Sequence, residues 1–139
     1  MKSVPLSAYD ETLGVIYFPR MLRKIRLHAA GDLREDFHEN LGKGMDEWCT
    51  KFLRVDYERL KERVLLGGTD EEILLWCFSL GRELDSTDKM IWNDFIRKRG
   101  WRDPAAEALA RRKKEGGFEN RDDIQTMPEY FEVDEGRRA

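Results

Sequence analysis

The stretch from Leu13 to Gly31 carries an apolar helical pattern with a proline, Pro19, near its middle. Proline cannot donate a hydrogen bond to the preceding helical turn, and it disfavours the α conformation of the residue before it. It is tolerated in the first turn of a helix. The pattern therefore predicts one helix that ends or bends at Pro19 and a second that begins there. Glycine is common just past a helix C-terminus, so the second helix is expected to stop at Gly31.

The second helix has an apolar face and a basic face when it is drawn on a helical wheel. The basic face holds three cations and one leucine: Arg20, Arg23, Lys24 and Leu27. A leucine among exposed cations is expected to contact either another part of the chain or a partner. We therefore predict that these four residues recognise a protein or a small anionic partner. Acidic residues near the end of the chain are an alternative, intramolecular occupant of this face.

Helical signals recur along the rest of the chain. Ser7 and Asp10 have capping-box spacing, which predicts a short helix beginning near Ala8. Other helices are predicted where apolar residues repeat at helical spacing or a capping residue precedes them. These segments are 45–53, 56–67, 69–78, 86–100 and 103–116. The run 73–78 is apolar all round, which predicts a central helix enclosed by its neighbours. The segment 32–44 is expected to be a polar connection with one helical turn.

These signals predict an all-α fold, a compact single-domain bundle of about six helices with an acidic C-terminal tail. Residues 1–117 are the expected helical domain, and residues 118–139 form the tail, which is expected to pack on that domain. Four aromatic residues are assigned to the core: Trp48, Trp76, Trp92 and Phe95. No stretch alternates apolar and polar residues for long enough to predict a strand.

Composition limits where the protein acts and what it binds. Its 25 Lys and Arg nearly balance its 28 Asp and Glu, and the formal net charge of −3 opposes attraction of the whole surface to nucleic acid or anionic lipid. No secretory signal and no apolar run of roughly 20 residues is seen, so no membrane association is expected. Cys49 and Cys77 lie in apolar helical patterns and are interpreted as buried, reduced thiols. The predicted location is the cytoplasm.

Four segments in this order resemble the bacterial domain of unknown function 5069 family: LGVIYFPRMLRKIRLHAAG, TDEEILLW, NDFIRKRGW and RDDIQTMPEYFEVDEGR. The resemblance extends from about Leu13 to Arg137. It implies a small, stand-alone helical protein from bacteria. It assigns no activity, ligand or cofactor.

Catalytic and metal-binding motifs are weak in this chain. Glu35 and His38 form a single Glu-x-x-His, whereas carboxylate-bridged metal sites in helical bundles use two copies. The other histidine, His28, is expected at the edge of an apolar stripe, and neither cysteine has a histidine near it in sequence. We therefore predict no metal, no cofactor and no catalytic residue. An enzyme whose site is assembled from residues distant in sequence is the third interpretation.

A basic segment with a neighbouring aromatic residue supports the second interpretation, a nucleic-acid-associated protein. Its residues are Arg97, Lys98, Arg99, Trp101 and Arg102. The cations could neutralise phosphates while Trp101 stacks on a base. Basic residues are also ordinary in the last turn of a helix, where they interact favourably with the helix dipole. The first interpretation, a binding module for a protein or small anionic partner, is therefore preferred.

Overall fold

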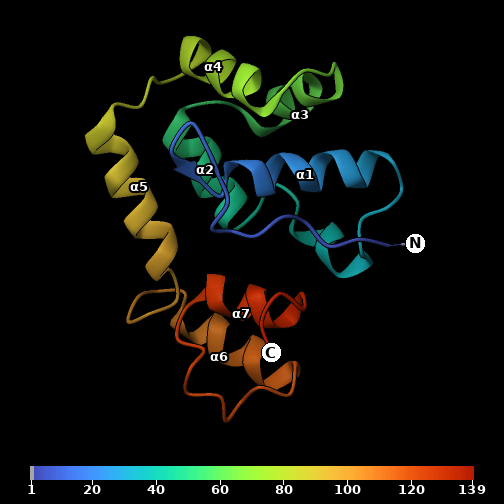
Figure 1. Cartoon of the computed structure of the whole chain (residues 1–139), viewed down its shortest axis with the longest axis vertical. Helices are drawn as coiled ribbons and strands as arrows, with labels where there is room; N and C mark the ends of the chain where they lie inside the picture. Colours follow the sequence, from blue (N-terminus) through green and yellow to red (C-terminus); the bar gives the residue numbers. More distant parts are fainter. Residues whose placement is uncertain (1) are drawn as a thin grey trace.

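The computed structural model describes residues 2–139, which form seven α-helices, one 3₁₀ helix (η1) and a two-stranded hairpin (Figure 1). In chain order the elements are β1 (Glu11–Thr12), β2 (Val15–Ile16), α1 (Phe18–Ala29), η1 (Glu35–Asn40), α2 (Met45–Leu53), α3 (Tyr57–Leu65), α4 (Asp70–Leu80), α5 (Ser86–Lys98), α6 (Ala106–Glu115) and α7 (Met127–Asp134). The prediction of a mostly helical domain is confirmed. Within the described range, no helix is long and apolar enough to cross a bilayer.

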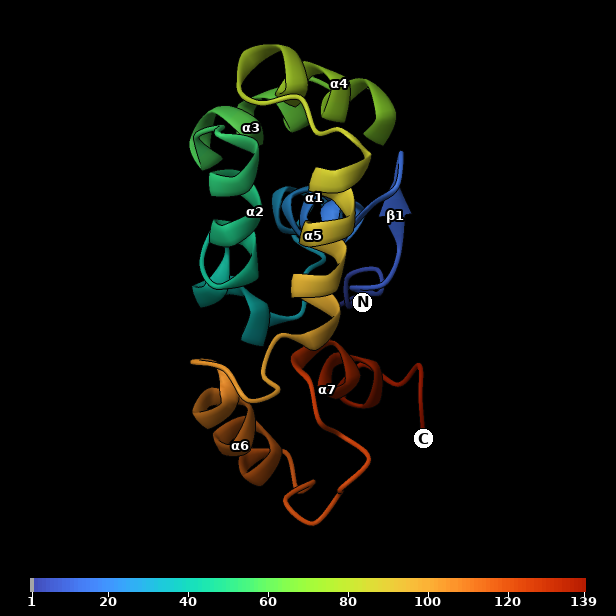
Figure 2. The same cartoon turned by 90° about the vertical axis from the view of Figure 1, so that its left-hand side faces the viewer.

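Helix α1 is the central element of the fold. Seen almost along its axis in Figure 2, it lies behind α5, between α2 and α3 on one side and the hairpin on the other. Eight of its twelve residues are buried. The prediction that α4 is the enclosed helix is wrong, because α4 covers α3 at one end of the molecule and keeps one face in solvent. Leu75 on that face is 55% exposed.

A hairpin replaces the helix predicted near Ala8. Strands β1 and β2 are antiparallel, with Thr12 opposite Val15. Leu13 and Gly14, which connect them, both have positive φ angles, 49° and 82°. A two-residue turn of this kind matches the twist of paired strands. The capping-box prediction is wrong because the Ser7 hydroxyl accepts a hydrogen bond from the Tyr9 amide and closes a turn instead.

The predicted helix after Pro19 is confirmed, although it begins one residue earlier. Tyr17 has a φ of 75° and precedes the first helical residue, and Pro19 lies in the first turn, where its missing N–H leaves no gap. The helix ends at Ala29, and Gly31 follows with a φ of 76°. The chain therefore turns sharply on both sides of α1, and these turns set the position of its side chains.

The last 22 residues contribute to the core as well as carrying carboxylates, so the description as an acidic tail is incomplete. Thr126 caps α7 by accepting a hydrogen bond from the Glu129 amide, and Pro128 lies in the first turn. Five residues of α7 are buried: Met127, Pro128, Tyr130, Phe131 and Val133. In Figure 1, α7 lies beside α6 at the opposite end of the molecule from α4, and one end of α5 reaches them.

The aromatic assignment to the core is only partly correct. Trp92 is buried, stacks on Phe52 with ring centroids 5.3 Å apart, and donates from Nε1 to the Ile16 carbonyl oxygen. Trp48 and Phe95 are instead more than a third exposed, because they line an open depression on the outside of the molecule. Both cysteines are buried and free, as predicted.

Candidate functional site

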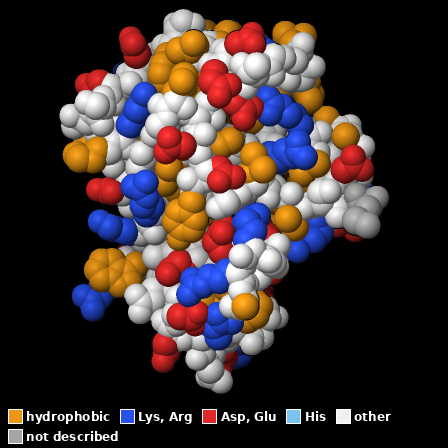
Figure 3. Space-filling view, in the orientation of Figure 1, with side chains coloured by type: hydrophobic (Ala, Val, Ile, Leu, Met, Phe, Trp, Pro, Cys, Tyr) orange, Lys and Arg blue, Asp and Glu red, His pale blue; other side chains and the backbone are white. Residues whose placement is uncertain are grey.

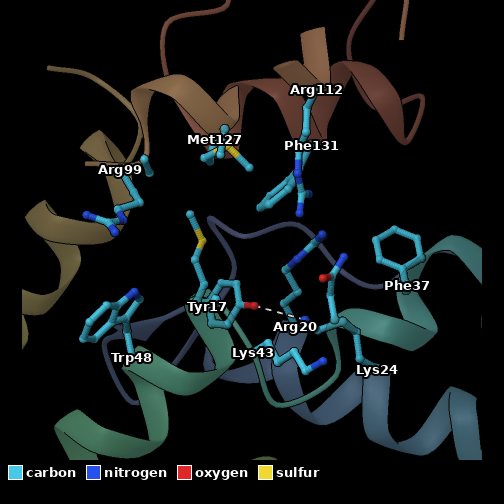
Figure 4. Close-up of a pocket in the computed structure, with 15 residues that line it drawn as sticks. Tyr17, Arg20, Lys24, Phe37, Lys43, Trp48, Arg99, Arg112, Met127 and Phe131 are labelled. Carbon is cyan, nitrogen blue, oxygen red and sulfur yellow. Dashed lines mark hydrogen bonds between the residues drawn. The ribbon is translucent and has the colours of Figure 1, made fainter. Parts of the chain in front are cut away.

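A cavity of about 180 Å³ lies between the α1 layer and the α6–α7 pair (Figure 4). Its lower wall comes from α1 and its N-cap and from α2: Tyr17, Arg20, Lys24, Met45 and Trp48. Its upper wall comes from the region after α5 and from α6 and α7: Arg99, Ala105, Ala108, Arg112, Met127 and Phe131. One side is closed by η1 and the segment after it: Phe37, Asn40, Lys43 and Gly44. In Figure 4, Arg20 points towards Phe131, and Arg112 points from α6 towards Arg20.

The cavity is cationic. Five of its lining residues are basic: Arg20, Lys24, Lys43, Arg99 and Arg112. None of the lining residues, all of which fall within the described part of the chain, is an aspartate or glutamate. The remaining lining is largely aromatic and apolar. This combination is typical of a site for a molecule with an anionic group and an apolar body.

Arg20 is the most buried cation of the cavity, with a residue exposure of 1%. Its Nη1 and Nη2 atoms donate to Glu135 at 2.8 and 2.7 Å, and Nη1 also donates to the Leu6 carbonyl oxygen at 2.9 Å. Burial alone would lower the pKa of Arg20, but the bidentate contact with Glu135 raises it above its ordinary value. The guanidinium also lies 4.3 Å from the centroid of the Phe131 ring. Arg20 is therefore held charged in one orientation.

One donor of Arg20 has no partner. Its Nε atom is buried, and within residues 2–139 no acceptor is in hydrogen-bond range. A buried N–H of a charged group without an acceptor costs about 1–3 kcal/mol or more, so such groups are rare in native proteins. The atom has almost no accessible surface, so it is a buried, unsatisfied donor beside the cavity and does not face the cavity's interior.

A second buried network occupies the floor of the cavity. Tyr17 Oη donates to Asp46 Oδ1 at 2.5 Å, and Lys24 Nζ lies 2.7 Å from the same oxygen and 3.1 Å from Tyr17 Oη. Burial raises the pKa of Tyr17 well above its ordinary value, so the phenol stays protonated. Burial also lowers the pKa of Lys24, against the opposing effect of Asp46. An ammonium has three donors, so Lys24 keeps one for a further acceptor.

The basic face predicted on α1 is wrong as an exposed surface. Arg20, Lys24 and Leu27 are buried, whereas Arg23 is exposed. Because α1 is the centre of the fold, cations on its polar side face carboxylates from elsewhere in the chain, Glu135 and Asp46. The alternative expected from the sequence, that acidic residues near the end of the chain occupy this face, is confirmed for Arg20 by Glu135. Arg20 and Lys24 meet in the cavity, but Arg23 and Leu27 do not line it.

The basic segment at the end of α5, residues 97–102, is divided between the cavity and the outer surface. Arg99 lines the cavity, whereas Lys98 and Trp101 line a shallow depression on the outside. Arg97 lies 3.7 Å from Asp94, and the guanidinium of Arg102 lies 4.9 Å from the centroid of the Trp101 ring. The five residues therefore do not form one continuous surface.

Sequence reasoning missed two of the cavity's cations, Lys43 and Arg112. Lys43 lies between two glycines in the segment predicted to be a polar connection, and Arg112 belongs to the basic end of α6. Neither is in an ion pair with any residue that the structure describes, whereas Arg20 and Lys24 each face a carboxylate. The local basic run around Arg112 was visible in sequence, but its approach to α1 was not.

The two histidines meet outside the cavity. Their rings lie edge to face with centroids 4.8 Å apart, and His38 Nε2 is 2.9 Å from the Leu33 carbonyl oxygen. Among residues 2–139 no three His, Cys, Asp or Glu side chains are grouped so that they could hold a metal ion. Burial raises the pKa of Cys49 well above its ordinary value, and that of Cys77 to about 12, which disfavours a reactive thiolate.

Comparison with known proteins gives a match to a family model. A family model described as a domain of unknown function (DUF5069) matches residues 2–137, a range that contains every lining residue of the cavity. No curated protein matches the chain.

Proposed function

Because the chain belongs to the family described as a domain of unknown function (DUF5069), its function must be inferred from its own chemistry, and we propose that it binds a small organic anion. The anion occupies the cavity between α1 and α7. The observation that carries this proposal is the lining of the cavity, which has five basic residues and, within the described chain, no aspartate or glutamate.

The charge balance of the cavity supports an anionic ligand. Glu135 and Asp46 neutralise Arg20 and Lys24 from behind the lining. Lys43 and Arg112 have no such partner among the described residues, and the contact of Arg99 with Asp103 is long at 3.5 Å. The wall therefore keeps a positive excess in a partly desolvated space, where charge interactions are stronger than in water.

The size and lining of the cavity define the ligand class. A space of about 180 Å³ is smaller than the roughly 300–1,000 Å³ of sites for drug-sized molecules. Tyr17, Phe37 and Phe131 offer aromatic surface to an apolar body. Guanidinium groups match the planar geometry of carboxylate and the oxygens of phosphate. We therefore infer a small aryl or alkyl carboxylate or phosphate monoester.

Thermal unfolding with small probes tests this proposal. Benzoate and phenyl phosphate are compared with benzamide, which is neutral and similar in shape, because a ligand that binds only the folded state raises Tm. We expect both anions, but not benzamide, to stabilise the protein. Equal stabilisation by benzamide, or none by any anion, would overturn the proposal.

A matched pair of variants on α6 locates the binding. Arg112→Met removes a lining cation that has no ion pair among residues 2–139, so the fold should be kept. Lys114→Met makes the same change at an exposed position outside the cavity. We expect Arg112→Met to weaken binding of phenyl phosphate by about tenfold or more, equivalent to about 1.4 kcal/mol, and Lys114→Met to leave it unchanged. Equal affinities for the two variants contradict binding in the cavity.

The thiols support the compartment that goes with this function. Cys49 and Cys77 are both free and buried, and free cysteines are typical of reducing compartments. We accordingly propose that the protein acts in the bacterial cytoplasm, where small organic anions are abundant as metabolites. Fractionation of the native host, followed by detection of the protein in the soluble cytoplasmic fraction, tests this.

A further inference from the structure

An aromatic groove runs along the outer face of α5, away from the cavity's interior. We define the α5 groove by its apolar lining: Trp48, Phe52, Ile91, Phe95 and Trp101. It consists of two adjoining depressions that share Ile91 and Phe95. In Figure 3, apolar side chains lie among Lys and Arg on the side where Figure 1 places α5. With thirteen residues, α5 is about 20 Å long, which is enough for several turns of a docked helix.

The groove exposes more apolar surface than isolated residues would. Ile91 is 54% exposed and Trp101 is 46% exposed, and Trp48 and Phe95 are exposed beside them. Single exposed apolar residues are normal, but adjoining ones with a polar rim are typical of interaction sites. Aromatic residues are also enriched in the centres of protein interfaces. The α5 groove therefore has the composition of a protein-binding surface.

Cations form the rim of the groove. Lys51, Arg54 and Arg82 line the first depression, and Lys98 lines the second. Lys51 pairs with Glu47 and Arg82 pairs with Asp88. Arg54 and Lys98 are in no ion pair with the described part of the chain. The rim therefore has a positive excess and complements an acidic partner.

The partly covered aromatic floor favours a peptide over a nucleic acid. Asp94 and Asp103 also line the second depression, but each lies beside an arginine of its own chain, Arg97 at 3.7 Å and Arg99 at 3.5 Å, so Lys98 is the unpaired charge there. One ring face of each exposed tryptophan is also covered by a guanidinium, Arg99 over Trp48 and Arg102 over Trp101. Base stacking on these rings is reduced accordingly. The apolar side chains of an amphipathic helix, by contrast, would contact only the apolar floor of the groove.

We propose that the α5 groove docks an amphipathic helical segment of a partner protein, with acidic residues beside its apolar stripe. The stripe lies on Ile91, Phe95 and Trp101, and the acidic residues face Arg54 and Lys98. This surface shares Trp48 with the wall of the proposed anion site, but the three stripe positions lie outside that cavity.

A peptide selection tests the proposal. The probe is a displayed library of 16-residue helices with a fixed apolar stripe and flanking positions that vary between Glu and Lys. It is panned against the full chain and two single-residue variants. Ile91→Glu places a charge in the groove, and Met90→Glu makes the same change at the next position, which is 57% exposed and outside the groove.

We expect Glu to be enriched over Lys against the wild-type chain and Met90→Glu, and a selected peptide to bind Ile91→Glu at least about tenfold more weakly. No enrichment, enrichment of Lys, or equal binding to Ile91→Glu overturns the proposal. Two further outcomes assign the groove to another occupant and also overturn it. One is binding of a 20-nucleotide oligo(dT) that is lost in Ile91→Glu. The other is a wild-type dimer in sedimentation that becomes monomeric in Ile91→Glu.

Discussion

Arg20 and Glu135 form a buried bidentate ion pair, although 115 residues separate them in the chain. The pair joins the central helix α1 to the segment that follows α7. Its geometry, with two N–H···O contacts at 2.8 and 2.7 Å, fixes the guanidinium at the edge of the cavity. The pair therefore serves both the stability of the fold and the orientation of the candidate anion site.

Removing the carboxylate of this pair should strongly destabilise the protein. Glu135→Ala leaves the Arg20 cation buried without its counter-ion, and the loss of one member of a buried pair typically costs about 3–5 kcal/mol. Urea unfolding measures the change in free energy. Glu119→Ala, an exposed glutamate in the same C-terminal segment, should change it by less than about 0.5 kcal/mol. Similar values for the two variants would show that the pair contributes little.

Stability should fall at alkaline pH because of the Cys77 thiol. Burial raises its pKa to about 12, against a smaller lowering by Arg63. In the unfolded chain the thiol titrates near about pH 8.5, so above that pH the unfolded state loses a proton that the folded state keeps. The contribution of Cys77 to the free energy of unfolding is therefore complete below about pH 8.5 and is lost as the pH rises to about 12.

The comparison of wild type with Cys77→Ala isolates this effect. Urea unfolding from about pH 8 to about pH 11 should give a steeper fall for wild type, by up to about 1.4 kcal/mol per pH unit. The contributions of Tyr17 and Lys24 are common to both proteins and cancel in the difference. Parallel pH profiles would contradict the assignment.

A methyl group at Gly81 should be poorly tolerated. A Cβ there would overlap the backbone carbonyl oxygens of Leu53 and Arg54, where the end of α4 approaches the end of α2. Because backbone has to move, we expect Gly81→Ala to cost about 2–3 kcal/mol. Gly117→Ala is the control, since its φ is +83° but its Cβ meets nothing within 4 Å. Backbone strain from the positive φ alone should cost about 1 kcal/mol at Gly117. Chemical denaturation of both variants therefore distinguishes steric crowding at Gly81 from backbone strain at Gly117.

The N-cap of α4 should contribute measurably to the free energy of unfolding. Thr69 Oγ1 accepts from the Glu72 amide at 3.1 Å, and Glu72 Oε1 accepts from the Thr69 amide at 3.3 Å. Thr69→Ala removes the hydroxyl and should lower the free energy of unfolding by about 1 kcal/mol. Ser79→Ala near the other end of the helix, where the hydroxyl donates only to the Trp76 carbonyl oxygen, should have less effect. Equal midpoints in urea for these two variants would argue against the capping box.

Elements with strong local signals were predictable from sequence. The cap at Thr69 and the proline in the first turn of α1 each act within a few residues, so helix starts could be inferred from them. The hairpin could not, because it depends on Leu13 adopting a positive φ, which is unusual for leucine. The exposure of the basic residues on α1 was also misjudged. A helical wheel assigns polar residues to solvent, and only the tertiary fold brings Glu135 and Asp46 to them.

Part of the candidate site could also be predicted from local sequence. Arg20, Lys24 and Arg99 belong to local basic runs, which predicted them as binding residues. Their meeting with Lys43 and Arg112 in one cavity depends on contacts between distant segments, which neither periodicity nor capping encodes. Arg112, whose replacement tests the anion proposal, could be recognised only after α6 was placed opposite α1.

The two walls of the cavity are synthesised at different times. Residues 17–48 supply the lower wall, and residues 99–131 supply most of the upper wall. When the ribosome has completed only about the first hundred residues, the α6–α7 wall opposite Arg20 and Lys24 does not yet exist. Arg20 also still lacks its ion-pair partner, Glu135. The nascent chain therefore displays cationic groups that the finished protein conceals. An anion bound as proposed would therefore need α7 in place, so its binding would follow synthesis of the C-terminal helix.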